Sequence, residues 1–331
     1  MINDQRIYLG QQFQIPDFAT EKRQDELFRL GRFAKLEKLP IDLNPTDAKG
    51  VVAIIADSTT FPNEFYAAAD DLRIVARWGV GFDQVNVSAA TNNGILITTA
   101  PVHMDTVAEY TVAQWLAIMK RTYTFNQMAH SSDKQLISCY DIQGSILGLY
   151  GFGRIGQEVA KRAIPLLGPD GRLIVYDIRK DIHEIALSFG AEVASKPEEL
   201  FTWCDTVSLH VSGADPVVHY EQLSLMQPHA SLLNPSRGNL VDDAAVLHAI
   251  NEGKMFYYVV DDPLDGPRAV FRKPPRIIST NHSGGITMES AARLDRKTFE
   301  QVNDAIHGKK PDYILNPEAL NHHKVRSWLR H

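Results

Sequence analysis

One short glycine-rich stretch constrains the fold of this chain more than any other part of the sequence. An apolar run, Ile146 to Tyr150, leads into Gly151, Gly153 and Gly156, and helix-forming residues follow. This order predicts a buried strand, a tight turn and a helix start, with the G-x-G-x-x-G spacing of a dinucleotide-binding loop. The first glycine forms the turn, the second lets a pyrophosphate approach, and the third lets helix and strand pack closely. The alternative is a glycine-rich turn that binds nothing.

An acidic residue follows this loop where a dinucleotide-binding unit needs one. A second apolar run, Leu173 to Tyr176, ends at Asp177. An acid about 20 residues beyond the last glycine is placed to bind the ribose 2′-hydroxyl of NAD. Asp177 would also repel the 2′-phosphate of NADP, so NAD is the expected cofactor. Arg179 and Lys180 follow closely and leave NADP open as an alternative.

The rest of the chain alternates short apolar runs with helical stretches, which is typical of parallel sheets. Strands are expected at residues 51–55, 72–76 and 95–99 before the glycine loop, and at 206–211, 230–233, 256–260 and 277–279 after it. Helices are expected at 107–121 and from 287 to about 306, whereas residues 122–144 show no readable pattern. The fold class is therefore α/β, and 331 residues suggest two domains.

Composition excludes several kinds of partner. The net charge is −6 without a long run of one sign, so neither nucleic acid nor a membrane surface is an expected partner. The N-terminus has no apolar signal-peptide region, and no apolar run approaches the length of a spanning helix. Neither the two cysteines nor the histidines of the C-terminal tail have metal-ligand spacing. We expect reduced thiols, a cytoplasmic protein and no metal site.

Three polar residues follow the expected ends of three separate strands: Arg237, Asp265 and His282. Strand ends meet at one edge of a parallel sheet, so these side chains could surround one substrate. A nicotinamide carries hydride but no proton, and a histidine can donate or accept that proton near neutral pH. A carboxylate would stabilise the imidazolium, and an arginine would bind a substrate carboxylate. Each residue also has a structural alternative: a packed histidine, an arginine that caps strand-end carbonyls, and a turn aspartate.

A second candidate loop follows the expected strand at 72–76. It reads Arg77-Trp78-Gly79-Val80-Gly81-Phe82-Asp83. Two glycines at the carboxyl end of a strand can expose backbone N–H groups, and a pair of these can hold a carboxylate. A plain turn is the alternative.

The chain resembles the D-isomer-specific 2-hydroxyacid dehydrogenase family from about residue 50 to about residue 318. The motifs that carry the resemblance are Arg77-Trp78-Gly79-Val80-Gly81-Phe82-Asp83, Val107-Ala108-Glu109, the glycine loop, Ser208-Leu209-His210, Asn234-Pro235-Ser236-Arg237-Gly238, Asp261, His282-Ser283-Gly284-Gly285 and Leu315-Asn316-Pro317-Glu318.

The resemblance implies a role for each matching residue. Arg237 is implied as the substrate-binding and catalytic arginine, and His282 as the acid/base. Val80 and Gly81 match the loop whose amides hold the substrate carboxylate. The implied cofactor-binding residues are Val107, Gly151, Gly153, Arg154, Ile155, Gly156, Asp177, His210 and Asp261, the last beside the nicotinamide carboxamide.

The sequence departs from the family pattern near the histidine. The family usually has Glu-Pro after the strand that contains Asp261, and that glutamate is the partner of the histidine. Here the chain reads Asp262-Pro263-Leu264-Asp265-Gly266-Pro267, so a glycine precedes the second proline. We expect Asp265, one residue before that glycine, to be the partner of the histidine. If nothing replaced the glutamate, the pKa of His282 would fall. Asn281 also replaces the usual proline, and residues 211–215 lack the usual proline and threonines.

The family reading implies two doubly wound parallel-sheet domains with a cleft between them. The flavodoxin-like substrate domain would comprise residues 1–106 and 300–331, so that the C-terminal segment completes it, and the Rossmann NAD-binding domain residues 107–299. Homodimers are implied as well. The expected activity is NAD-dependent hydride transfer between nicotinamide and a small D-2-hydroxy acid or 2-keto acid. The alternatives are an NAD(H)-sensing, corepressor-like binding protein and a formate- or phosphite-type dehydrogenase.

Overall fold

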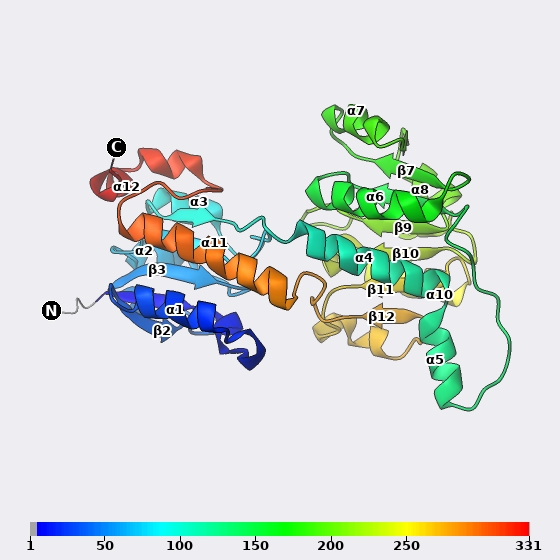
Figure 1. Ribbon diagram of the computed structural model, residues 1–331, viewed down its shortest axis with the longest axis horizontal. Coiled ribbons are helices and arrows are strands. Elements are labelled where there is room, and N and C mark those ends of the chain that lie inside the picture. Colours follow the sequence, from blue (N-terminus) through cyan, green and yellow to red (C-terminus); the bar gives the residue numbers. More distant parts are fainter. Residues whose placement is uncertain (1–4, 331) are drawn as a thin grey trace. The chain divides into compact units, whose positions relative to one another are not determined.

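The computed structural model describes residues 5–330, which form two compact units (Figure 1). Unit 1 contains the described residues up to His103 and those from Thr287 onward, and unit 2 is the continuous stretch Met104–Ile286. The second boundary therefore lies near residue 286 rather than near residue 299. The reason is helix α11 (Met288–Ile306), which packs on strands β3 (Val51–Ala56) and β4 (Ile74–Arg77) and so belongs wholly to unit 1.

Unit 1 is built on a five-stranded parallel sheet in the order β2-β1-β3-β4-β5. This is the strand order of flavodoxin-like domains. The remaining strands are β1 (Arg6–Leu9), β2 (Lys35–Lys38) and β5 (Leu96–Thr98). The remaining helices are α1 (Glu21–Leu30), α2 (Asn63–Ala68), α3 (Val87–Asn92) and α12 (His323–Trp328), with 3-10 turns η1 (Gln11–Gln14), η2 (Pro16–Phe18), η3 (Pro45–Ala48) and η6 (Pro317–Asn321).

The apolar strands of unit 1 are buried on both faces. Successive side chains of a strand point to opposite faces. Ile54 accordingly packs in one core with residues of α2, whereas Ile55 packs in another with Phe299 and Val302 of α11. Figure 1 shows α11 lying across this sheet. The continuous run Val-Val-Ala-Ile-Ile-Ala of β3 is what such a two-sided burial requires.

The C-terminal segment completes unit 1, as expected. Ile314 forms an antiparallel bridge with Thr98 at the edge of β5, and Leu315 donates its N–H to the carbonyl of Ile97. The buried side chain of Asn316 accepts from the Ile97 N–H at 2.8 Å and donates to the Ile95 carbonyl at 2.9 Å. The segment thereby covers backbone groups at the sheet edge.

Unit 2 contains a seven-stranded parallel sheet in the order β12-β11-β10-β9-β6-β7-β8. Counted from β6, this is the Rossmann order with one added strand. The strands are β6 (Ile146–Tyr150), β7 (Arg172–Tyr176), β8 (Glu192–Val193), β9 (Thr206–Leu209), β10 (Ser231–Asn234), β11 (Tyr257–Val260) and β12 (Ile277–Ser279). The two-domain α/β class with both sheet types is thus confirmed.

Helices cover both faces of this second sheet. They are α4 (Met104–Met119), α5 (Thr122–His130), α6 (Arg154–Leu167), α7 (Asp181–Ser188), α8 (Glu198–Trp203), α9 (Tyr220–Leu223) and α10 (Asp243–Asn251), with 3-10 turns η4 (Gly238–Leu240) and η5 (Gly266–Arg272). Helices α4, α6 and α7 pack on one face and α8, α9 and α10 on the other. Between residues 5 and 330, no helix is both long and apolar enough to cross a membrane.

Candidate functional site

The glycine loop lies where the strand order of unit 2 reverses, between β6 and β9. Gly151 has a left-handed φ of 97°, and a Cβ there would overlap the carbonyl oxygen of His210 at the end of β9. A Cβ on Gly156 would lie 2.6 Å from the Gly151 carbonyl oxygen. Gly153 is the N-cap of α6 and provides no side-chain cap. The strand–turn–helix is confirmed, and the uncapped helix start offers N–H groups to an anion. Exposed Arg154 and half-buried Ile155 form its first turn.

Asp177 lies directly after β7 and is buried beside the glycine loop. Its Oδ2 accepts from the Phe152 N–H at 2.9 Å, and its Oδ1 accepts from the N–H of Arg179 at 2.9 Å. The Arg179 guanidinium also pairs with it at 3.2 Å. Burial by itself raises the pKa of this carboxyl, but the bonds from Arg179 and Phe152 outweigh it and lower the pKa. Asp177 is therefore held as a charged acceptor at the place expected for a ribose.

Two other expected cofactor residues lie on neighbouring elements. His210 follows β9, and its Nε2 is 2.9 Å from the Ser208 hydroxyl. Burial lowers the pKa of His210 to about 3, which keeps the ring neutral. Val107 is buried in the first turns of α4. The glycine loop, the uncapped start of α6 and the buried acid together fit a dinucleotide.

The Arg237 loop follows β10 and is shaped by Asn234. The Asn234 side chain donates to the Arg237 carbonyl at 2.7 Å and accepts from the Ser236 N–H at 3.1 Å. The Ser236 hydroxyl donates to the carbonyl of Leu209 at 2.7 Å, which ties the loop to β9. Arg237 itself is half-buried and donates from Nη1 to the Ser236 carbonyl at 2.8 Å. Its guanidinium is thus presented at the carboxyl end of the sheet.

Asp261, at the end of β11, holds the turn that carries the histidine. Its Oδ1 accepts from the Ser283 N–H and the Thr280 hydroxyl, each at 2.8 Å, and its Oδ2 accepts from the Gly284 N–H at 2.8 Å. The Thr280 oxygen lies 2.5 Å from the hydroxyl of Tyr110 on α4. Since Thr280 donates to Asp261, Tyr110 must donate to Thr280. Asp261 therefore anchors the turn that carries His282. The family resemblance implied only a position beside the nicotinamide for this residue.

The turn itself is left-handed at two successive residues. Asn281 has φ 51° and His282 has φ 59°. Proline is fixed near φ −65° and cannot adopt the first of these values, whereas asparagine tolerates it better than most residues. The departure from the family pattern at position 281 thus has a structural reason.

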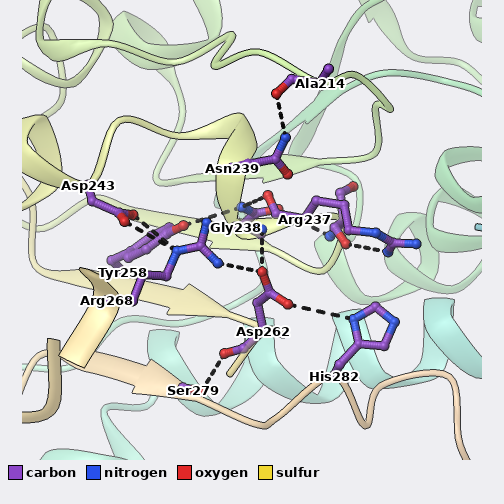
Figure 2. A network of polar contacts seen from close by, with 12 residues as sticks. Ala214, Arg237, Gly238, Asn239, Asp243, Tyr258, Asp262, Arg268, Ser279 and His282 are labelled. Atoms are coloured by element: carbon purple, nitrogen blue, oxygen red, sulfur yellow. Dashed lines mark hydrogen bonds and ion pairs between the residues drawn. The ribbon is translucent and has the colours of Figure 1, made fainter. Parts of the chain in front are cut away.

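The carboxylate beside His282 is Asp262. Its Oδ1 lies 4.0 Å from Nδ1 of the half-exposed imidazole, an ion-pair distance once the ring is protonated. Its Oδ2 accepts from the N–H of Gly238, the residue after Arg237, at 3.0 Å. Figure 2 shows this carboxylate between the Arg237 loop and His282. One side chain therefore links the loop that carries Arg237 to the imidazole of His282.

Asp265 does not take the place expected for it. Its carboxylate pairs with Arg272 at 2.9 Å, and both side chains are largely exposed, with 80% of Asp265 accessible. The residue occupies the N-cap position of η5 but makes no side-chain cap hydrogen bond. In the structure, the carboxylate within ion-pair distance of His282 is that of Asp262, whereas Asp265 pairs with Arg272. The sequence contains an indication of this arrangement. Asp261 and Asp262 are consecutive residues at a strand end, so their side chains must point in opposite directions, and only one of them can hold the same turn.

The candidate carboxylate loop belongs to unit 1 and follows β4. Gly79 has φ 145°, and its carbonyl accepts from the Ala100 N–H at 2.8 Å. Arg77 donates from Nε to the Gly81 carbonyl at 3.0 Å, and Val80 and Gly81 are half-buried. Both glycine carbonyls are thus turned inward. Among residues 5–330, no group of three or more His, Cys, Asp or Glu residues is arranged to hold a metal ion.

Comparison with known proteins identifies the family. Residues 112–284 match the model of the D-isomer-specific 2-hydroxyacid dehydrogenase NAD-binding domain. A glyoxylate reductase of Korarchaeum cryptofilum is 31% identical over 295 residues, which cover 85% of each chain. The chain belongs to the D-isomer-specific 2-hydroxyacid dehydrogenase family. As a member, it is an NAD-dependent oxidoreductase whose cofactor is NAD.

Other relatives differ from the chain in length or in sequence. D-3-phosphoglycerate dehydrogenase of Methanocaldococcus jannaschii is 30% identical over 287 residues, 83% of this chain and 53% of that protein. The chain thus spans about half the length of this relative. The crystal structure of a glyoxylate reductase from Paecilomyes thermophila superposes with a TM-score of 0.78 over 95% of this chain and 99% of the other, at 21% identity. That likeness supports the fold alone.

Proposed function

We propose that this protein interconverts a small 2-keto acid and its D-2-hydroxy acid with NAD(H). The observation that carries the proposal is the position of the Asp262 carboxylate. It accepts from the N–H of Gly238, the residue after Arg237, and lies at ion-pair distance from the ring of His282. Asp262 thus faces the histidine and binds the loop that carries the arginine, and these are the two groups that carbonyl reduction of an anionic substrate needs. The similarity to glyoxylate reductases over most of both chains supports a small keto acid as substrate.

In the proposed reaction, each side chain has one task. NADH, when bound on the glycine loop, supplies the hydride. Arg237 binds the carboxylate of the keto acid and stabilises negative charge on the carbonyl oxygen. Because Nδ1 of His282 faces Asp262, Nε2 is the atom that donates the proton to that oxygen. In the reverse direction, the neutral imidazole removes the hydroxyl proton, and Asp262 stabilises the resulting imidazolium.

For unit 1, we propose that the N–H groups of Val80 and Gly81 bind the substrate carboxylate. The support is the inward direction of the Gly79 and Gly81 carbonyls, which are bonded to Ala100 and Arg77. Successive amides in such a turn form an anion-binding concavity.

Replacement of the histidine tests the proposal. His282→Ala should lower kcat for glyoxylate or pyruvate reduction by at least about 10²-fold, because the proton donor is lost, while NADH binding stays within about twofold. Steady-state kinetics and NADH fluorescence titration measure the two quantities. His130→Ala, an exposed histidine at the end of α5, is the matched control and should behave as the wild type. An unchanged rate in His282→Ala removes the residue from the mechanism.

A panel of 2-keto acids, formate and phosphite tests two other functions. An NAD(H)-sensing, corepressor-like protein would bind NADH but turn over no keto acid. A formate- or phosphite-type dehydrogenase would reduce NAD with one of those anions and ignore the keto acids. The panel is run with NADH and NADPH for the acids and with NAD for the two anions. We further propose a cytoplasmic homodimer, for which size-exclusion chromatography with light scattering measures the assembly.

A further inference from the structure

A second arginine touches the acid that links the proposed catalytic residues. Arg268, on η5, pairs through Nη1 with Oδ2 of Asp262 at 2.5 Å. Its Nε pairs with the carboxylate of Asp243, the first residue of α10, at 3.2 Å. Arg268 is largely buried, with 18% of its side chain accessible, so solvent screens these contacts only weakly. Figure 2 shows the guanidinium lying between the two carboxylates.

The packing around Arg268 reaches the loop of Arg237. A Cβ at position 238 would overlap the Arg268 guanidinium, so glycine is what lets the side chain lie flat against this loop. The Gly238 N–H and Arg268 Nη1 both bind Oδ2 of Asp262, which leaves Oδ1 for His282. The Asp262 carbonyl accepts from the Ser279 hydroxyl at 2.7 Å, which restrains its backbone as well. The carboxylate is thus fixed in orientation by η4 and η5, and its backbone by β12.

We infer that Arg268 is a positioning residue that fixes the Asp262 carboxylate between the Gly238 amide and the His282 imidazole and offsets part of its charge. Nothing in the family motifs assigns this role, since the usual histidine partner is absent from its place here. The inference rests on the proposed function for its kinetic consequence only. An arginine suits the task because its planar fork can bind two carboxylates at once, which a lysine cannot do in the same geometry.

The charge balance around the histidine sets the direction of the effect. Asp262 after β11 faces the ring directly, and Figure 2 shows Arg237 after β10 on the same side of the network. Arg268 on η5 lies behind Asp262, and Asp243 on α10 lies beyond Arg268. Removing the positive charge of Arg268 leaves two acids uncompensated, which favours the imidazolium and raises the pKa of His282. Removing the charge of Asp262 has the opposite sign. A residue with a merely structural role would not move this pKa in a set direction.

The pKa of His282 is measured by NMR of the histidine Cε1–H groups, with the His282 signal assigned by its loss in His282→Gln. Arg268→Met should raise this pKa by about half a pH unit or more, and Asp262→Asn should lower it by a similar amount. Arg272→Met is the matched control, since Arg272 lies on the same η5 and pairs with exposed Asp265. It should leave the pKa within about 0.2 units. An unchanged or lowered pKa in Arg268→Met overturns the inference.

Kinetics provide the second readout. Arg268→Met should lower kcat about 10-fold or more, with KM changed less than about threefold. In an Asp262→Asn background, the same substitution should lower kcat little further, because both changes act through one carboxylate. Arg268→Lys keeps the positive charge but loses the planar guanidinium. Compared with Arg268→Met, it should restore the pKa of His282 more fully than kcat. If Arg268→Met does not fold, Gly238→Ala displaces the guanidinium and should shift the pKa in the same direction. Absence of keto-acid turnover in the wild type refutes the proposed function but leaves the NMR test intact.

Discussion

At the scale of single residues, the environment of Asp177 bears on the choice between NAD and NADP. The carboxylate is buried, charged and aimed at the glycine loop, which suits the ribose hydroxyls of NAD. Arg179, however, lies against the same carboxylate and within 3.8 Å of where a Cβ of Gly153 would be. The arginine that could bind a 2′-phosphate is therefore held by the acid that repels it.

Asp177→Ala should release this arginine. The ratio of kcat/KM for NADH to that for NADPH is expected to fall at least about 10-fold, because the ribose loses an acceptor and the phosphate gains a cation. Steady-state kinetics with both cofactors at one keto-acid concentration measure the ratio. Arg179→Met is the control variant and should lower NADPH use without this reversal. A ratio that does not change in Asp177→Ala would show that Asp177 does not select the cofactor.

The residues near the histidine show what the sequence could and could not predict. His282 and Arg237 are recognisable because each follows an apolar strand and matches a family motif. Asp265 was the expected partner of the histidine because the family's glutamate has no counterpart here and Asp265 is the nearest acid along the chain, but its carboxylate pairs with Arg272. The acid near the histidine is Asp262 instead, because its side chain points away from that of Asp261 and toward Gly238. The role of Arg268 depends on how η5 folds back, which no local pattern indicates.

At the scale of elements, the turn from Thr280 to Gly284 is fixed by Asp261 and by Tyr110 of α4. A Cβ on Gly284 would lie 2.7 Å from Oδ2 of Asp261 and 2.7 Å from the Tyr110 ring. Neither neighbour is free to move, since both belong to the hydrogen-bond chain that holds the turn. The turn therefore has space for glycine alone.

Gly284→Ala should lower the free energy of unfolding by about 1–3 kcal/mol, because the methyl group forces buried neighbours apart. It should also lower kcat, since the turn presents His282. Urea unfolding followed by circular dichroism measures the first effect. Gly213→Ala is the matched control, because its nearest neighbour would be Leu240 at an ordinary 3.5 Å, and it should stay within about 0.5 kcal/mol. Equal stability of the two variants would contradict the packing argument.

The elements that the sequence predicted are the apolar ones. Strand β6 and strand β12 have the bounds expected from their apolar runs, and β3 differs by one residue. Strand β2, Lys-Leu-Glu-Lys, was missed because an edge strand with charged residues shows no apolar run. Helix α5 was missed because its nine residues have no buried face. Tertiary position, rather than local preference, decides such elements.

At the scale of the whole molecule, the chain builds one unit from a continuous segment and the other from its two ends. Unit 2 needs nothing outside Met104–Ile286 to complete its sheet. Unit 1 needs α11, because Phe299 and Val302 of this helix fill its core. Asp295 of the same helix forms a buried ion pair with Arg23 at 2.6 Å. A charge left unpaired in such a site costs about 3–5 kcal/mol.

The two units should therefore differ as isolated fragments. The fragment Met104–Ile286 is expected to unfold cooperatively and to bind NADH within about 10-fold of the full chain, because its core and glycine loop are complete. The fragment that ends at His103 is expected to lack a cooperative transition, since the face of its sheet under α11 is uncovered. Thermal unfolding by circular dichroism and NADH titration measure both. A cooperative transition in the shorter fragment would show that α11 is dispensable.

The discontinuity of unit 1 has a consequence for how the protein is made. A ribosome releases residues in order, and domains generally fold as units during synthesis. The Rossmann unit can close as soon as residue 286 has emerged, whereas the strands made first must wait for α11 and the segment that pairs with β5. During that interval the apolar face that α11 later covers is open to chaperones and to other nascent chains. The part of the chain that is translated first is thus the last to become native.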